Sequence, residues 1–290
     1  MERESAEASR GRTVRLDRFC RLWEEARVKW IRRGRGSMYR RLQSLRFLLT
    51  RDRRAVFAFL QAEYPIPLPL HTRLALVARF VHITNQVRAY HSQAQMLTIA
   101  DAILRRAGRP DLTVVECGCG KGSSTAKLSL IVALAGGRLI ACDSFRGMPP
   151  NEERHQDLLG RTMVFRAGAF RGRLREVQRT VELFGAPQVV EYRKGWFQDT
   201  LPSLDRQIDV VFLDVDLLES TRTCLVSLYP RLRSGGVIFS QDGHIRAIAA
   251  LLAEERFWRQ DVGAEPPAIA GLGDRKFLAI GTPSASGLSR

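Results

Sequence analysis

The stretch VVECGCGKGSS, residues 114–124, decides the fold. An apolar run leads into Gly118, Gly120 and Gly122, which are separated by single residues and followed by two serines. Glycine permits positive φ and a close approach of the backbone, so a tight turn from a buried strand into a helix is expected here. The N-terminus of that helix, with Ser123 and Ser124, suits an anionic group.

Strand and helix patterns alternate on both sides of this turn. Short apolar runs predict strands at 112–116, 138–143, 188–193, 208–214 and 236–240. Helical periodicity predicts helices at 91–108, 123–136, 170–185, 219–232 and 244–258, and residues 267–271 and 275–281 pair as a hairpin. Apolar strands joined by helical crossovers predict an α/β fold: a doubly wound, mostly parallel, Rossmann-like sheet of about seven strands with an antiparallel C-terminal hairpin.

The composition fits a large α/β domain with an appendage, because 45% of the 290 residues are apolar. No apolar run is long enough to cross a membrane, and the first residues lack the apolar core of a secretory signal. The five cysteines follow no regular spacing, so we expect a reduced, cytoplasmic protein. Three of them lie near the glycine loop, but three sulfurs without a fourth ligand favour small loop fillers over a metal site.

The positive charge is concentrated at the start of the chain. Residues 1–54 hold 17 basic against 7 acidic side chains, which accounts for ten of the sixteen formal net charges. Such a patch is typical of contact with nucleic acid or anionic lipid. The competing interpretation is a solvated helical arm whose arginines pair with other subunits, and core-like helical spacing favours it at Trp23, Trp30, Leu42 and Phe47. We therefore expect a homo-oligomer and no nucleic-acid partner, and keep peripheral membrane contact through the basic arm as a hypothesis.

Three parts are predicted along the chain. Residues 1–70 form the basic helical N-terminal arm and a linker, whose alternating prolines make residues 64–71 extended. Residues 71–282 form the main domain, and residues 283–290 form a flexible tail.

The second strand ends in Asp143, which lies 23 residues beyond Gly120. A carboxylate there is placed to accept both hydrogen bonds of a ribose diol, as in dinucleotide-binding folds. NAD and S-adenosylmethionine (SAM) both fit, and a tight turn without a ligand is the third interpretation. The G-x-G-x-G spacing favours SAM, and so does Glu116, which would repel a pyrophosphate but is suited to hold an ammonium group.

Acidic and amide side chains follow the next two strands. Asp214 and Asp216 come after one strand, and Gln241 and Asp242 after the other. Adjacent parallel strands lie roughly 5 Å apart, so Asp214, Gln241 and Asp242 converge at one edge of the sheet. Oxygen ligands suit Mg²⁺ or Ca²⁺, which would lower the pKa of a substrate hydroxyl and orient it for attack. The competing interpretation is that the carboxylates cap the following helices.

The long polar segment 145–168 is expected to be a lid or binding loop. His155 within it is a candidate for assisting proton removal, although an exposed histidine without a role is the more ordinary interpretation. His91, just before a predicted helix, is a comparable candidate for holding the carboxylate of SAM.

Successive motifs resemble the macrocin O-methyltransferase family in order over residues 91–245. They read ECGCGKGSSTAKLS, CDSFRGMPP, KGWFQDTLPSL, LDVDLLESTRTCLVSLYPRLRSGG and SQDGH. The resemblance implies a SAM-dependent, Mg²⁺-assisted enzyme of natural-product biosynthesis that methylates hydroxyls of sugars.

The resemblance also implies roles for individual residues. Those that would hold the methionine portion of SAM are Glu116, Gly118, Gly120, Ser123 and Ser124. Asp143 would hold the ribose, and the residues that would border the adenine are Ser144, Phe145, Gly195, Trp196 and Phe197. Ordinary core packing is the competing interpretation for Trp196. Asp214 would be both metal ligand and base, with Gln241 and Asp242 completing the metal site.

Two positions depart from the family pattern. Gln241 stands where the family usually has the first of two aspartates, so the expected metal site loses one negative charge, and Leu218 replaces a usual tyrosine. We expect an O-methyltransferase acting on a small-molecule or glycosylated acceptor. The alternatives are a methyltransferase for a lipid-linked or polymeric glycan at the membrane surface, and a non-catalytic SAM-binding protein with a decayed metal site.

Overall fold

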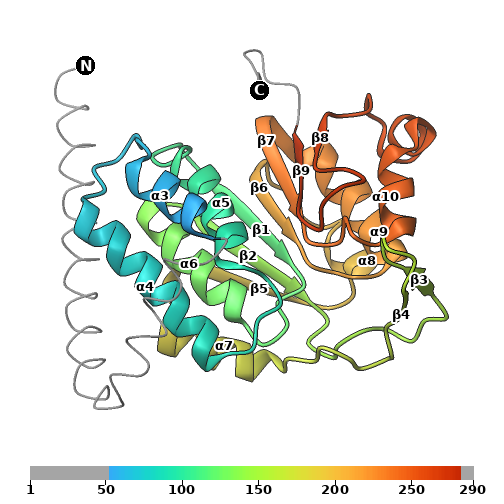
Figure 1. Cartoon of the computed structure of the whole chain (residues 1–290), viewed down its shortest axis with the longest axis horizontal. Coiled ribbons are helices and arrows are strands. Elements are labelled where there is room, and N and C mark those ends of the chain that lie inside the picture. The colour runs from blue at the N-terminus through green and yellow to red at the C-terminus, as the bar shows by residue number, and fades with distance from the viewer. Residues whose placement is uncertain (1–51, 282–290) are drawn as a thin grey trace. The chain divides into compact units, whose positions relative to one another are not determined.

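The computed structural model describes residues 52–281. Within this range the chain forms a seven-stranded main sheet with helices packed against it (Figure 1). The helices expected within residues 1–51 and the tail predicted over residues 283–290 lie outside this range. The strand order is β5-β2-β1-β6-β7-β9-β8. The chain adds β2 and β5 on one side of β1, and then β6 and β7 on its other side. The strand order therefore switches at β1, which the predicted glycine turn follows.

Five of the strands are parallel and form the centre of the sheet. They are β1 (Thr113–Cys117), β2 (Arg138–Asp143), β5 (Val190–Lys194), β6 (Ile208–Leu213) and β7 (Leu232–Ser240). Every residue of β1 and β6 is buried, because helices cover both faces of the sheet.

Helices lie on both sides of the sheet (Figure 1). One side carries α4 (Leu70–Gln86), α5 (Gln93–Leu104), α6 (Ser123–Ala135) and α7 (Leu174–Phe184). The other carries α8 (Phe197–Thr200), α9 (Leu218–Leu228) and α10 (Arg246–Ala253). This confirms the predicted doubly wound α/β fold. Within residues 52–281, no helix combines the length and the apolar character that a membrane span requires.

The helix predicted over 170–185 begins four residues later, at Leu174. Phe170 has a φ of +57°, which a right-handed helix does not allow. The chain then passes directly against the glycine loop, since a Cβ on Gly172 would lie 1.6 Å from the carbonyl oxygen of Gly120. Because of this close approach, α7 begins later in the chain than predicted.

The C-terminal hairpin extends the sheet in the antiparallel sense, as predicted. Strand β9 (Leu278–Gly281) pairs with β7 and with the short β8 (Ile269–Ala270). The helix predicted over 244–258 is interrupted, because α10 ends at Ala253 and a π-helical turn follows at Phe257–Val262. The buried Trp258 anchors that turn by donating its indole N–H to the Leu252 carbonyl at 2.9 Å.

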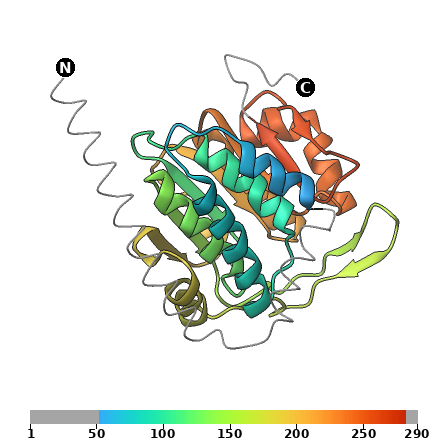
Figure 2. The same ribbon diagram turned by 60° about the vertical axis from the view of Figure 1, so that its left-hand side comes forward.

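A small hairpin lies within residues 145–168, the segment predicted to be a lid or binding loop. It consists of β3 (Arg154–Gln156) and β4 (Thr162–Val164), paired in the antiparallel sense. Figure 2 shows this hairpin in yellow-green, extending away from the main sheet. We call residues 144–169, which include it, the lid segment.

Residues 54–70, which the sequence assigned to the arm and linker, belong to the same compact unit as the rest of the described chain. Helix α3 (Arg53–Gln61) buries Val56 and Phe59. The Arg73 guanidinium of α4 donates to backbone carbonyls of Leu60, Ala62 and Leu68. The proline-rich segment is non-helical through Pro69, as expected, and α4 begins at Leu70.

Two phenylalanines of α3 provide a test of this packing. Phe59 is 2% exposed and Phe57 is 55% exposed. Because it leaves a cavity in the core, Phe59→Ala should lower the free energy of unfolding by about 3–5 kcal/mol. Phe57→Ala on the same helix should change it by less than about 0.5 kcal/mol. Urea denaturation followed by circular dichroism measures both, and equal effects would show that α3 is not part of the core.

Candidate active site

A cleft of about 1190 Å³ opens at the carboxyl ends of the parallel strands. Most residues singled out from the sequence line it: Gly118, Gly120, Ser123, Ser124, Asp143, Ser144, Gly195, Trp196, Phe197 and Asp214. Four do not line it and are buried beside it: Glu116, Phe145, Gln241 and Asp242. The topology therefore brings both predicted groups of residues to one cavity.

The three glycines of the loop serve different purposes, although each has a positive φ. A Cβ on Gly118 would lie 2.1 Å from the carbonyl oxygen of Asp214, and one on Gly122 would lie 3.1 Å from Val177 of α7. A Cβ on Gly120 would meet nothing within 4 Å. Packing against the protein thus requires the first and third glycines, and only the second faces open space.

Asp143 is fixed by the backbone of its surroundings. Its Oδ2 accepts the N–H of Cys119 at 2.8 Å, and its Oδ1 accepts the N–H of Phe145 at 2.7 Å. Burial raises the pKa of Asp143, while these amides oppose the rise. Asp143 also lines the cleft, and a carboxylate has about four acceptor sites, so it is placed to accept a further hydrogen bond from a ligand there.

Glu116 is completely buried, with neither carboxylate oxygen in a regular hydrogen bond to the described residues. Burial raises its pKa to about 7, against the lowering effect of the neighbouring Ser124 and Thr125 hydroxyls. The carboxyl group lies behind the glycine loop rather than on the cleft surface. Its expected contact with an ammonium group stays a prediction.

The aromatic residues divide between the cleft and the core. Phe145 has a φ of +55°, is 4% exposed and packs against Tyr192 at a ring-centroid distance of 6.5 Å. Trp196 lines the cleft just before α8 and is not one of the buried core residues. Phe197 lines the cleft and also packs against the core.

Three carboxylates gather at the other end of the cleft. One oxygen from each of Asp214, Asp216 and Asp242 lies within 4.8 Å of the others, a spacing suited to a shared cation. Burial raises the pKa of all three, repulsion within the cluster adds to the rise for Asp214 and Asp216, and Lys276 opposes it. A cation bound between them would oppose this rise and favour the charged carboxylates.

The carboxylates do not act as caps for the following helices. The residues at the N-cap positions of α9 and α10 are Leu217 and Ile245, which offer no capping side chain. Asp242 Oδ2 instead accepts the N–H groups of Val215 and Asp216, both at 3.1 Å. These bonds hold the loop after β6 against the loop after β7.

Gln241 was predicted to join the metal site, and its Nε2 donates to Gln95 Oε1 of α5 at 3.0 Å. Its Oε1 is buried and has no donor among the described residues, as is also true of Asp242 Oδ1. Asp216, which was not among the predicted metal ligands, belongs to the cluster and has a φ of +60°. The Asp-x-Asp spacing shows that Asp216 is close to Asp214 in the chain, but it does not specify this backbone conformation.

A buried lysine beneath the glycine loop was not foreseen. Lys127 of α6 is fully buried, and its Nζ donates to Thr84 Oγ1 at 2.7 Å and lies 2.9 Å from His91 Nε2. Burial lowers the pKa of Lys127 to about 7 and lowers that of His91 as well. His91 lines the cleft. A single charged residue within the apolar helix SSTAKLSLIVALA was the available signal.

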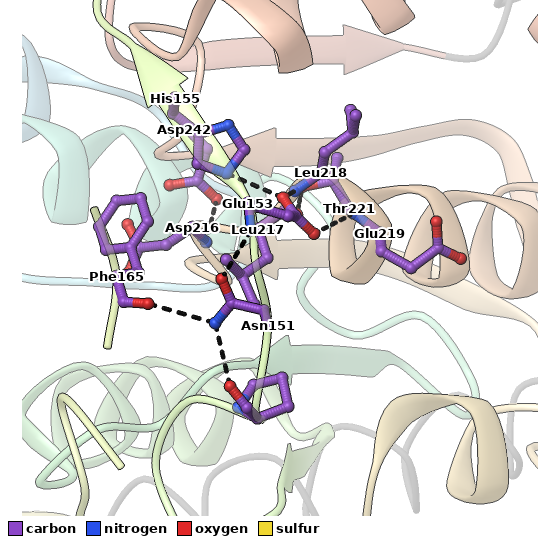
Figure 3. Close-up of polar contacts among 11 residues, drawn as sticks. Asn151, Glu153, His155, Phe165, Asp216, Leu217, Leu218, Glu219, Thr221 and Asp242 are labelled. Carbon is purple, nitrogen blue, oxygen red and sulfur yellow. Dashed lines mark hydrogen bonds and ion pairs between the residues drawn. The ribbon is translucent and has the colours of Figure 1, made fainter. Parts of the chain in front are cut away.

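His155 is buried, contrary to the exposed position expected for it. Its side chain is 3% exposed, and Nε2 lies 2.8 Å from Glu153 Oε2 (Figure 3). It does not line the cleft, so it is not placed to take a proton from a substrate there.

The cysteines near the glycine loop do not form a metal site. Cys117, Cys119 and Cys142 are buried, and their pKa values are raised. Across residues 52–281, the aspartate cluster is the only group with metal-ligand spacing.

Comparisons with known proteins agree with this geometry. A family model described as macrocin-O-methyltransferase (TylF) matches residues 95–265. One similar protein is a 4'-O-methyltransferase of Streptomyces olivaceus, which is named for 8-demethyl-8-(2,3-dimethoxy-α-L-rhamnosyl)-tetracenomycin C. It is 32% identical over 140 residues, which cover 46% of this chain and 54% of its own length. A demethyldecarbamoylnovobiocin O-methyltransferase of Streptomyces niveus is 32% identical over 108 residues, 34% of this chain and 39% of its own. The chain thus spans about half or less of the length of these curated relatives.

Solved structures share the fold at low sequence identity. The O-methyltransferase NovP superposes with a TM-score of 0.57 at 20% identity, over 72% of this chain and 98% of its own. CalS11, a calicheamicin methyltransferase, gives a TM-score of 0.51 at 16% identity, over 79% of this chain and 90% of its own.

The unequal roles of the glycines lead to a matched pair of variants. Gly120→Ala should cost about 1–2 kcal/mol, the strain of a side chain in the left-handed region. Gly118→Ala should cost a further 1–3 kcal/mol or so, because its Cβ would press on the Asp214 carbonyl. Thermal unfolding measures the difference, and equal melting temperatures would contradict this close contact.

Proposed function

The chain belongs to the macrocin O-methyltransferase family, and we propose that it transfers the methyl group of SAM to a hydroxyl of a sugar or secondary metabolite. One observation carries the proposal: a single cleft joins the glycine loop and Asp143 to the cluster of Asp214, Asp216 and Asp242. The first group suits a nucleoside cofactor, and the second suits activation of a hydroxyl.

The residues at the first end of the cleft fit SAM. Gly120 leaves open space at the loop, and the α6 N-terminus with Ser123 and Ser124 would receive the carboxylate of the methionine portion. Asp143 would accept from the ribose hydroxyls with its remaining lone pairs. Trp196 and Ser144 would border the adenine, whereas Phe145 would support that region from the core.

Bound SAM supplies an electrophilic methyl group on a sulfonium sulfur. In the proposed transfer, the acceptor oxygen would form a bond to the methyl carbon as the bond from that carbon to sulfur breaks, and S-adenosylhomocysteine would be the product. The hydroxyl must also lose its proton. Asp214 lines the cleft and has a pKa raised by burial, so it is suited to accept that proton near neutral pH.

The second end of the cleft fits a hard divalent cation such as Mg²⁺. Asp214, Asp216 and Asp242 would provide carboxylate ligands. Asp242 Oδ1 and Gln241 Oε1 are buried acceptors that no donor reaches in the described part of the chain. Such an ion would lower the pKa of a bound hydroxyl. Three gathered carboxylates also favour an active enzyme over a SAM-binding protein with a decayed site.

The acceptor is proposed to be a glycosylated small molecule. The curated relatives are named for rhamnosyl-tetracenomycin and novobiocin substrates. The cleft volume of about 1190 Å³ exceeds the roughly 300–1,000 Å³ of ordinary ligand pockets, which leaves room for an acceptor beside the cofactor. The membrane-surface alternative depends on the basic arm outside the described residues, and stays a prediction together with the cytoplasmic location and the homo-oligomeric state.

The ribose contact can be tested with Asp143→Asn. An amide offers one acceptor oxygen instead of two, so either a loop N–H or a ribose hydroxyl loses its partner, and SAM affinity should fall about tenfold to a hundredfold. Isothermal titration calorimetry measures the change, with the exposed Asp205→Asn as control. Unchanged affinity, or a preference of the parent protein for NAD, would contradict the assignment.

The acidic cluster can be tested with Asp214→Asn. Methyl transfer to a pool of glycosylated acceptors should fall by about a hundredfold or more, because general-base catalysis is lost, while SAM affinity stays within a few-fold of the parent. Mass spectrometry of products made from labelled SAM measures the transfer. EDTA should also reduce the rate, and added Mg²⁺ should restore it. Transfer that survives EDTA would exclude the metal, and transfer that survives Asp214→Asn would exclude the base.

A further inference from the structure

Helix α9 receives its N-terminal cap from a distant part of the chain. The first backbone N–H groups of a helix have no partner within the helix, and a polar side chain at the N-cap usually accepts one of them. The N-cap of α9 is Leu217, which has no acceptor in its side chain. The acceptor comes from Glu153 in the lid segment, 65 residues before Leu218, whose N–H it binds.

Glu153 binds two consecutive amides at this helix end (Figure 3). Its Oε2 accepts the N–H of Leu218 at 2.8 Å, and its Oε1 accepts the N–H of Glu219 at 3.3 Å. A carboxylate in this position is also favoured by the positive end of the helix dipole. The lid is therefore fastened to α9 through charge-assisted hydrogen bonds.

The lid holds this carboxylate in place from its own side. Asn151 donates from Nδ2 to the Phe165 carbonyl at 3.2 Å, which ties the two arms of the lid together, and its Oδ1 accepts the N–H of Glu153 at 3.2 Å. His155 contacts Glu153 Oε2 and packs its ring against Phe165 at a centroid distance of 5.8 Å. Glu153 is thus a preorganised cap rather than a chance surface contact.

The capped helix directly follows the loop that carries Asp214 and Asp216. Every amide from residue 214 to residue 219 donates a hydrogen bond. The acceptors, in order, are the Cys117 carbonyl, Asp242 Oδ2 for two amides, the Val215 carbonyl, and Glu153 for the last two. The lid therefore supplies the final two of six bonds that fix this loop.

The lid also contacts the loop that carries Gln241 and Asp242. The N–H of Leu158 donates to the His244 carbonyl at 3.0 Å, and Asp157 forms an antiparallel bridge with Ile245. One docked hairpin thus contacts both loops that bring the carboxylates of the cleft together.

We propose that Glu153 is a positioning residue for methyl transfer: by capping α9 it aligns the Asp214–Asp216 loop, and it does so only while the lid is docked. This inference rests on the proposed function. Docking of the lid over an acceptor would then also complete the arrangement of the base, so the base would be aligned only in the closed cleft. Glu153 acts through the helix end and is not assigned a bond to the acceptor.

Hydrogen exchange tests the cap without relying on catalysis. In Glu153→Ala, peptides covering residues 214–224 should exchange about fivefold to tenfold faster, as expected for the loss of a helix cap. In Glu153→Gln, which keeps an acceptor oxygen, they should exchange at a rate between those of Glu153→Ala and the parent. Glu182→Ala removes an exposed carboxylate of α7 and serves as the charge control. Unchanged exchange in Glu153→Ala would overturn the proposal.

Kinetics tests the positioning role with the same variants. In Glu153→Ala, kcat should fall about tenfold to a hundredfold, because a catalytic group is misplaced. SAM affinity should stay unchanged in this variant. In Glu153→Gln, kcat should lie between the values of Glu153→Ala and the parent. Faster exchange with unaltered kcat, or a loss of SAM affinity that accounts for the lost activity, would overturn the positioning role. Absence of methyl transfer in the parent protein would instead refute the proposed function, and the exchange result would still decide whether Glu153 caps α9.

Discussion

The candidate site depends on the contact between the loops that follow β1 and β6. The Asp214 N–H donates to the Cys117 carbonyl at 3.0 Å, and Gly118 lies so close that a Cβ would reach within 2.1 Å of the Asp214 carbonyl oxygen. Parallel pairing of two buried strands thus sets the spacing between the two ends of the cleft. That spacing is fixed by backbone atoms, and side chains are left free to provide the chemistry.

The features that sequence could predict are those encoded by neighbouring residues. Alternating apolar strands and amphipathic helices indicate the fold, since each period is visible within one short segment. Asp143 and Asp214 were found because parallel strands end at a common edge, so a polar residue that follows a buried strand has a predictable place. The lining of one cleft by both residues agrees with that rule.

The features that sequence could not predict depend on contacts between distant segments. Asp216 joins the cluster through a left-handed backbone at a non-glycine residue, which the pattern Asp-x-Asp does not specify. Gln241 directs its amide nitrogen to Gln95 of a helix 146 residues earlier. The cap of α9 comes from the lid segment, in which the sequence predicted no strands. Each depends on tertiary packing that no local propensity records.

The buried Lys127 couples the fold to solvent protons. Lys127 has no carboxylate partner within residues 52–281, and its folded pKa of about 7 lies below the 10.5 of an ordinary lysine. Between these two values the unfolded chain holds a proton that the folded chain gives up, so folding releases it. Lys127 therefore opposes folding fully below pH 7, and this penalty disappears as the pH rises toward 10.5. Through Lys127 alone, the free energy of unfolding therefore increases as the pH rises from about 7 toward 10.5.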